Sequence, residues 1–396
     1  MKFLRRWKRS APPDASSPPP PLAPSQDSSV PDGSGVAPSS GPATARVSVH
    51  SGTGWDDSEV VPAEVRTRGM TPDAFGLYPH ELLMLSYAPT FATDHTDFQG
   101  FWWWQYGVQN PRELLVSLTA RGFVETGGPE QAVARQTAAS LKDLLRTRGL
   151  KLGGNKAEIV ERVLASVPHE TINKAFPQRW YVRTQAGEEA LASSEHIDYI
   201  HRERDLDGLD IYTLSALRAE YPQHQWRDLV WGHLNQMSLQ HAQAGNFGFY
   251  RNTKFNMARF CAEERRHRDA LGLITEVIYC DLSGIGNGFT RDRPTPDVEY
   301  LFPYDLSLAT VPPGVTDLAF KWAAAGGVED AELHSLLADR LSQLSMPFHL
   351  FSKDEVLQII FLERAKDITA LSALYEQAER RFRQASERGP GGQSYK

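Results

Sequence analysis

Residues 140–163 read SLKDLLRTRGLKLGGNKAEIVERV. Gly149 stands where a first helix must end in the left-handed conformation. After a short connection, Asn155 caps a second helix, and Glu158 completes a capping-box pattern three residues later. The apolar positions that share one face are Leu141, Leu144 and Leu145 in the first helix and Ile159, Val160 and Val163 in the second. The stretch therefore predicts two amphipathic helices joined by a glycine-rich turn.

This hairpin is basic within an acidic protein. Residues 135–164 carry seven Lys or Arg and three Asp or Glu, a net charge of +4, whereas the whole chain carries −7, which leaves −11 for the remainder. The start of the second helix also presents backbone N–H groups and the positive end of the helix dipole, which favour a phosphate. We therefore expect a phosphate-binding surface made of Lys142, Arg146, Arg148, Lys151, Gly153, Gly154, Asn155, Lys156 and Arg162.

Over residues 136–166 the hairpin resembles the SAP domain, a small DNA-binding helical hairpin. The resemblance is carried by Leu-Lys-x-x-Leu at 141–145, Gly-Leu at 149–150 and Gly-x-Lys-x-Glu-Ile-x-x-Arg at 154–162. It covers less than a tenth of the chain. It implies binding to duplex DNA with low sequence specificity through phosphate contacts, without a cofactor. The alternative is that these are solvated charges on a hairpin whose partner is not DNA.

The segments on either side of the hairpin predict one host domain. Three helical segments, 79–87, 98–106 and 111–120, precede a strand at Phe123–Val124, and a strand at 180–182 is followed by a helix that begins at Thr184. Each strand lacks a neighbour unless the two pair with each other, and closing the long loop between them costs little extra entropy. The pattern resembles a winged-helix domain, 75–130 plus 178–200, with the hairpin at 131–177 inserted in its wing. The aromatic cluster at 101–106 is interpreted as core rather than as a base-stacking platform, and Lys174, Arg179 and Arg183 are expected to extend the basic surface.

The two ends of the chain differ in composition. Of the 32 residues from 11 to 42, ten are Pro, eight Ser and three Gly, so we predict that 1–74 is a disordered arm. Residues 201–396 predict an irregular α-helical domain with a TPR-like hairpin near 252–281 and a capped helix that begins at Ser352. The predicted fold class is mainly α, and the helical domain is expected to hold a protein partner.

Candidate catalytic groups are sparse. The glycines at 284–288 lack the preceding strand and following helix of a dinucleotide fingerprint. A second cluster, His196, His201, Asp205, Asp207 and Asp210, lacks metal-ligand spacing and is interpreted as a solvated loop rather than a metal site.

Composition limits the function classes further. Only two cysteines occur, and no apolar run reaches the ~18 residues of a membrane span, so we expect a cytoplasmic protein without a span. The layout is similar to bacterial SAP-containing proteins. We predict a non-enzymatic DNA-binding protein. The alternatives are an interaction scaffold without DNA binding or, less favoured, a metal-dependent nuclease.

Overall fold

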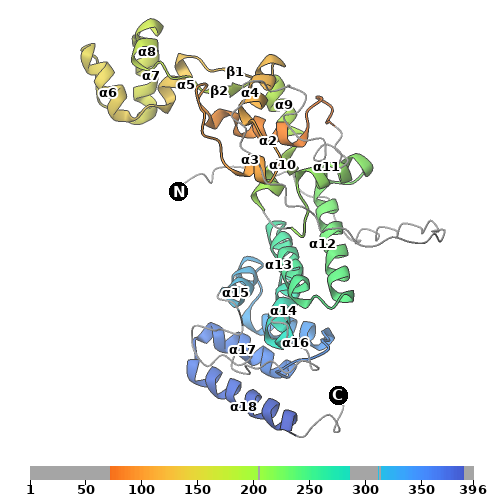
Figure 1. Cartoon of the computed structure of the whole chain (residues 1–396). Coiled ribbons are helices and arrows are strands. Elements are labelled where there is room, and N and C mark those ends of the chain that lie inside the picture. Colours follow the sequence, from red (N-terminus) through yellow and green to blue (C-terminus); the bar gives the residue numbers. More distant parts are fainter. Residues whose placement is uncertain (1–71, 204–205, 286–310, 312–313, 388–396) are drawn as a thin grey trace, which may run out of the picture. The chain divides into compact units, whose positions relative to one another are not determined.

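The computed structural model describes residues 72–203, 206–285, 311 and 314–387, and it is mainly helical (Figure 1). These residues divide into two compact units, 72–226 and 227–387. The predicted disordered arm, 1–74, lies outside the described residues except for its last three. Of the helices within the described ranges, none combines the length and apolarity needed to cross a membrane.

The first unit contains short helices and one pair of strands. In chain order these are α2 (Pro79–Tyr87), η2 (Ala88–Thr90), α3 (Phe101–Trp104), α4 (Pro111–Ala120), β1 (Val124–Thr126), α5 (Pro129–Arg135), α6 (Ala138–Thr147), α7 (Lys156–Ser166), α8 (His169–Ala175), β2 (Tyr181–Arg183), α9 (Gln185–Ala192), α10 (Glu195–Arg202) and α11 (Ile211–Glu220). The predicted helices at 79–87 and 111–120 are confirmed. The one predicted at 98–106 is shorter, because α3 has only four residues.

The strands β1 and β2 pair across the insertion. They are antiparallel, with Val124 opposite Arg183 and Thr126 opposite Tyr181. One step beyond the ladder, the backbone N–H of Gly127 donates to the carbonyl of Trp180 at 2.8 Å. The predicted pairing is thus confirmed, with each strand one residue later than expected, while the likeness to a winged helix stays a prediction.

The start of α9 is pressed against the start of β1. The Thr184 hydroxyl donates to the carbonyl of Gly122 at 2.6 Å, and it also accepts from the N–H of Gly187 at 3.2 Å. A Cβ atom on Gly187 would lie 2.2 Å from the carbonyl oxygen of Phe123. The close approach of the two backbones therefore requires glycine at this position.

A buried histidine and three tyrosines connect α10 and α11 with the other helices of the first unit. The ring of His201 lies 2.8 Å from the Tyr87 hydroxyl through Nε2 and 2.6 Å from the Tyr106 hydroxyl through Nδ1. The Tyr212 hydroxyl donates to the carbonyl of Tyr106 at 2.7 Å. The predicted boundary after residue 200 is therefore corrected to Trp226, because α10 and α11 belong to this core.

The aromatic cluster at 101–106 is only partly core. Phe101, Trp102 and Tyr106 are buried, as predicted, but Trp103 and Trp104 are 46% and 67% exposed. Successive helical residues point about 100° apart, so consecutive aromatic residues cannot all face one core. The interpretation of the whole cluster as core is wrong for these two side chains.

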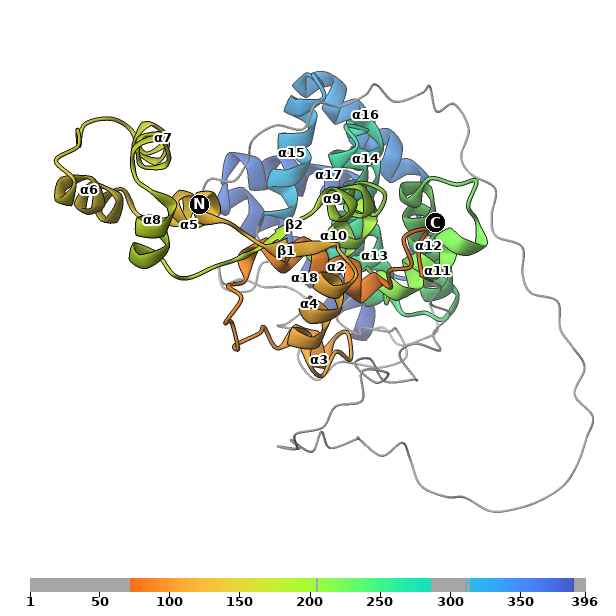
Figure 2. The ribbon, with the colours of Figure 1, turned by 90° about the horizontal axis from the view of Figure 1, so that it is seen from above.

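The inserted segment has its own core. Helices α6, α7 and α8 group together beside the β1–β2 pair (Figures 1 and 2). Its apolar side chains form one buried cluster, which consists of Val133, Leu141, Leu145, Ile159, Val163, Val167 and Ile172. The cluster begins on α5 and ends on α8, two short helices that the sequence analysis did not predict. The hairpin therefore packs on itself, as expected, but with a helix added at each end.

The second unit consists of seven described helices. They are α12 (Trp226–Gln243, whose first residue belongs to the first unit), α13 (Phe247–Glu263), α14 (His267–Ser283), α15 (Val315–Ala325), α16 (Asp330–Gln343), α17 (Lys353–Ala365) and α18 (Ile368–Glu387). Helices α13 and α14 form the predicted pair, and the capping box of Ser352 with Glu355 is confirmed at the start of α17. The likeness to a TPR repeat stays a prediction.

Buried carboxylates paired with arginines connect helices of the second unit. Glu276 on α14 is 5% exposed, and its carboxylate accepts from Arg340 on α16 at 2.7 Å and from the Tyr250 hydroxyl on α13. One turn further along, Arg251 donates two hydrogen bonds to Asp281, at 2.7 and 2.8 Å. Lys254 on α13 also lies 3.6 Å from the Glu276 carboxylate. These pairs help to fix how α13, α14 and α16 pack, since a buried carboxylate is costly without its cations.

We predict that the host domain folds without the hairpin. Replacing residues 128–178 by a six-residue Gly/Ser linker should preserve the near-ultraviolet circular dichroism of the aromatic core, because the buried cluster at 133–172 is internal to the hairpin. A small loss of stability, about 1 kcal/mol, is expected because Arg135 no longer stacks on Trp180 or donates to the carbonyl of Pro89. Loss of the aromatic signal would show that host and hairpin fold as one body.

A second prediction tests the close approach at α9. Gly187→Ala should destabilise the first unit by about 1–3 kcal/mol, since the added methyl group overlaps the Phe123 carbonyl. Gly232→Ala is the control, because that glycine lies in α12 with nothing within 4 Å of an added Cβ. Chemical denaturation followed by the near-ultraviolet signal measures both variants. Equal stability of the two would contradict the assigned packing.

Candidate nucleic-acid interface

One of the predicted phosphate ligands holds the turn of the hairpin instead. The Nη1 group of Arg162 on α7 donates to the carbonyl of Lys151 at 2.8 Å and to that of Gly153 at 2.9 Å. These two carbonyls belong to the connection between α6 and α7, where no helix supplies them with donors. Arg162 is therefore a structural residue, and its side chain is only partly exposed.

Two glycines shape the same connection. Gly149 has a φ of +64°, the left-handed conformation predicted for the end of α6, and Gly154 has a φ of +123°. A Cβ atom on Gly154 would also lie 2.5 Å from a carboxylate oxygen of Glu158, whereas Gly153 has room for a side chain. Of the two adjacent glycines, only Gly154 is therefore required by the backbone.

The start of α7 already holds a carboxylate. The side-chain oxygen of Asn155 accepts from the N–H of Glu158 at 3.1 Å, as predicted. The Glu158 carboxylate, however, accepts from the side-chain amide of Asn155 at 2.8 Å and not from its backbone. This negative charge lies beside Gly154, where a phosphate was expected, so the helix terminus is a weaker anion site than the sequence indicates.

The remaining cations of the hairpin separate into two groups. Arg146 forms an ion pair with Asp143, and Arg148 donates to the hydroxyl of Thr171 on α8 at 2.6 Å. Within the described ranges, by contrast, the ammonium groups of Lys142, Lys151 and Lys156 have neither an ion-pair partner nor a hydrogen-bond acceptor. These three lysines, one on α6, one in the connection and one at the start of α7, are named the lysine set below.

The cations expected to extend this surface are already engaged. Lys174 pairs with Glu170 at 2.8 Å, and Arg183 pairs with Glu188 at 2.8 Å. Arg179 donates to the carbonyl of Phe176 at 2.7 Å and also to that of Gln178. Of the predicted continuation of the basic surface, only Arg179 keeps a charge that its partners do not offset, because Lys174 and Arg183 each pair with a carboxylate.

The histidines singled out in the sequence are buried, which corrects their interpretation as part of a solvated loop. His196 lies 3.2 Å from the Ser215 hydroxyl and 2.9 Å from Arg218, and burial, aided by that arginine, lowers its pKa to about 3. Asp210 caps α11 by accepting from two of its backbone N–H groups. In the described part of the chain, no three His, Cys, Asp or Glu side chains are grouped to hold a metal ion.

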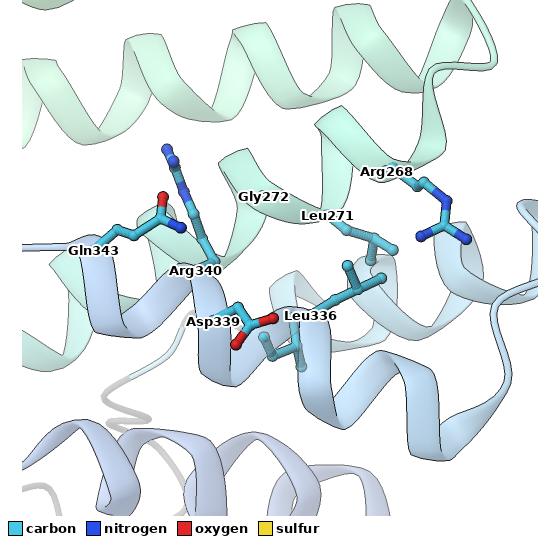
Figure 3. A pocket seen from close by; sticks show the side chains of 8 residues that line it. Arg268, Leu271, Gly272, Leu336, Asp339, Arg340 and Gln343 are labelled. Carbon is cyan, nitrogen blue, oxygen red and sulfur yellow. The ribbon is translucent and has the colours of Figure 1, made fainter.

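A small cleft lies between α14 and α16 of the second unit (Figure 3). Its volume is about 200 Å³, below the roughly 300 to 1,000 Å³ of small-molecule sites. Both arginines on its walls are engaged, Arg268 with Glu332 and Arg340 with Glu276. The hairpin is therefore the better candidate site.

Comparison with known proteins agrees with this geometry. A family model described as the SAP domain matches residues 133–167. The first and last residues of the match, Val133 and Val167, are both members of the buried cluster of the hairpin. No curated protein and no solved structure matches the chain. The match covers the helical hairpin with its own core, and the chain is a SAP domain-containing protein.

Proposed function

We propose that the SAP domain binds duplex DNA with low sequence specificity through phosphate contacts made by the lysine set. The observation that carries this proposal is that the ammonium groups of Lys142, Lys151 and Lys156 have no partner among the described residues, whereas most of the neighbouring cationic side chains do. A lysine ammonium is a point charge that suits a phosphate and does not discriminate between base edges. The expected binding is therefore electrostatic.

Two arginines add charge to this surface without being free to move. The partners of Arg148 and Arg162 are a hydroxyl and two carbonyls, which are neutral, so their positive charges are not compensated by these bonds. Arg146, in contrast, shares its charge with Asp143, although both side chains are more than 60% exposed and the pair is weak in water. The lysine set thus lies in a positive local potential, which favours an anionic partner.

The host domain is a poor reader of base edges. Arg121 directly follows α4, the helix that would enter a groove, and it is bound to the buried Glu81 at 2.6 Å, which leaves Arg112 as the exposed arginine of α4. Val116, at 52%, is the large hydrophobic side chain that this helix exposes. A helix that reads bases needs polar side chains that reach their edges. This supports the proposal that affinity comes from the hairpin and that specificity is low.

We further propose that the protein acts by binding rather than by catalysis, and in the cytoplasm. Both cysteines, Cys261 and Cys280, are buried thiols without a disulfide, as suits a reducing compartment. The second unit is proposed to hold a protein partner. The alternative, an interaction scaffold that does not bind DNA, is distinguished by the following experiment.

We predict that affinity for a duplex of mixed sequence falls steeply with salt. If three phosphates are neutralised, log K should decrease against log salt with a slope of roughly −2.7, and the dissociation constant should lie near 10⁻⁴ to 10⁻⁶ M at physiological salt. Lys156→Ala should remove about one third of the slope. The triple variant Lys142→Ala/Lys151→Ala/Lys156→Ala should lose most of the slope and keep only the contribution of the neighbouring arginines. Fluorescence anisotropy with a labelled duplex measures each isotherm.

The matched control is Lys321→Ala. Lys321 is also an exposed lysine on a helix, α15 of the second unit, and this substitution changes the net charge by the same amount. It should leave both the affinity and the slope unchanged. Equal binding by the wild-type chain and the triple variant would contradict the proposal and favour the scaffold.

A further inference from the structure

The side chains of Trp103 and Trp104 form an exposed aromatic pair on a rigid base. The two residues before them, Phe101 and Trp102, are buried. The ring of Phe101 packs against the ring of His201 at 4.7 Å between centroids. The exposed pair is therefore held by the core of the host domain, and it is not the end of a loose loop.

The two indoles converge over one glycine. A Cβ atom on Gly100 would lie 3.3 Å from Cζ2 of Trp103 and 3.4 Å from Nε1 of Trp104, so the edges of both rings meet there. Among the described residues, the indole N–H of Trp104 has no acceptor. The pair thus offers two aromatic faces and one hydrogen-bond donor. These groups suit a polyproline helix, because aromatic faces pack against the proline rings and a donor binds one of the unpaired backbone carbonyls.

The charge near the pair argues against a nucleic acid as its occupant. Along the sequence, residues 93–110 contain Asp94 and Asp97, both exposed, and no lysine or arginine, and the next cation is Arg112 on α4. This segment supplies the pair with no cation, whereas stacking platforms for single strands combine aromatic rings with cations. An uncharged, proline-rich segment needs no such cation.

We propose that the exposed tryptophan pair binds the proline run of this chain, Pro18 to Pro21. This run lies within residues 15–26, which carry no charged side chain. Four consecutive prolines favour the polyproline conformation, so little conformational entropy is lost when they bind. The contact would hold the N-terminal arm on the host domain.

The chain is long enough to make this contact within one molecule. About 50 residues separate the run from residue 72, and the random-coil relation gives an end-to-end distance of roughly 40 Å for 50 residues. A domain of about 155 residues has a radius of gyration of roughly 15 Å. The effective concentration of the run is then on the order of 1 mM, so a contact with a Kd of about 100 µM would be occupied about nine-tenths of the time.

The test uses the full chain labelled with 5-fluorotryptophan and followed by ¹⁹F nuclear magnetic resonance. Trp103→Phe and Trp104→Phe assign the two resonances. Changing Pro18, Pro19, Pro20 and Pro21 together to Ser should shift both resonances, to the same extent at 20 and 200 µM protein, and leave those of the buried Trp102 and of Trp180 in place. The matched control changes Pro12, Pro13, Pro31 and Pro38 to Ser and should shift neither.

Several results would overturn the proposal. One is that the resonances of Trp103 and Trp104 are the same in all three chains. Another is that both proline variants shift them equally. A shift that grows with protein concentration would assign the contact to a second copy of the chain. A shift caused only by an added single-stranded oligonucleotide would assign the pair to base stacking.

Discussion

The first unit depends on three residues of β1 pairing with three residues of β2 across the inserted hairpin. A single strand would leave its backbone N–H and C=O groups without partners, so neither half of the host domain is complete without the other. The pairing is reinforced at both ends, by the bond of Gly127 to Trp180 and by the bonds of Thr184 to Gly122 and Phe123. The hairpin is therefore tethered at two points that are fixed relative to each other.

In the proposed function, stability and DNA binding rest on different side chains of the SAP domain. The buried cluster and the turn held by Arg162 maintain the hairpin. The ammonium groups of the lysine set take no part in the ion pairs or hydrogen bonds of the described residues. Removing its charges should therefore alter binding while leaving the fold intact. The same division explains why the spacing of basic residues does not by itself identify the ligands. Of the six predicted cations, Arg162 holds the backbone, Arg146 pairs with an acid, Arg148 bonds a hydroxyl and three lysines remain available.

The fold was predictable where local signals and burial agree. The ends of α2 and α4, the left-handed Gly149 and the cap at Ser352 follow from sequence, because proline, glycine and capping side chains act on their nearest neighbours. Helices α5 and α8 were missed, since seven residues are too few for an apolar periodicity to show. The boundary at Trp226 was missed because the bonds of His201 join residues about a hundred positions apart.

The candidate site was predictable as a region but not residue by residue. Positive charge and the glycine pattern located the hairpin, and the family model agrees. Which carbonyls lack donors, and which carboxylate lies beside Gly154, depend on the folded backbone. The roles of Arg162 and Glu158 could therefore not be read from the sequence. The exposure of Trp103 and Trp104 follows from helical geometry. At these two positions the geometry outweighs the general preference of aromatic residues for cores.

Hydrogen exchange of the full chain, with and without duplex DNA, tests the central claim most directly. We expect the amides of α6 and α7 to exchange with an opening free energy of their own, different from that of β1 and β2. We also expect DNA to slow exchange in the segment that carries the lysine set while the β1–β2 pair is unchanged. Exchange of residues 124–183 as one cooperative unit, or protection by DNA confined to α4, would contradict the account.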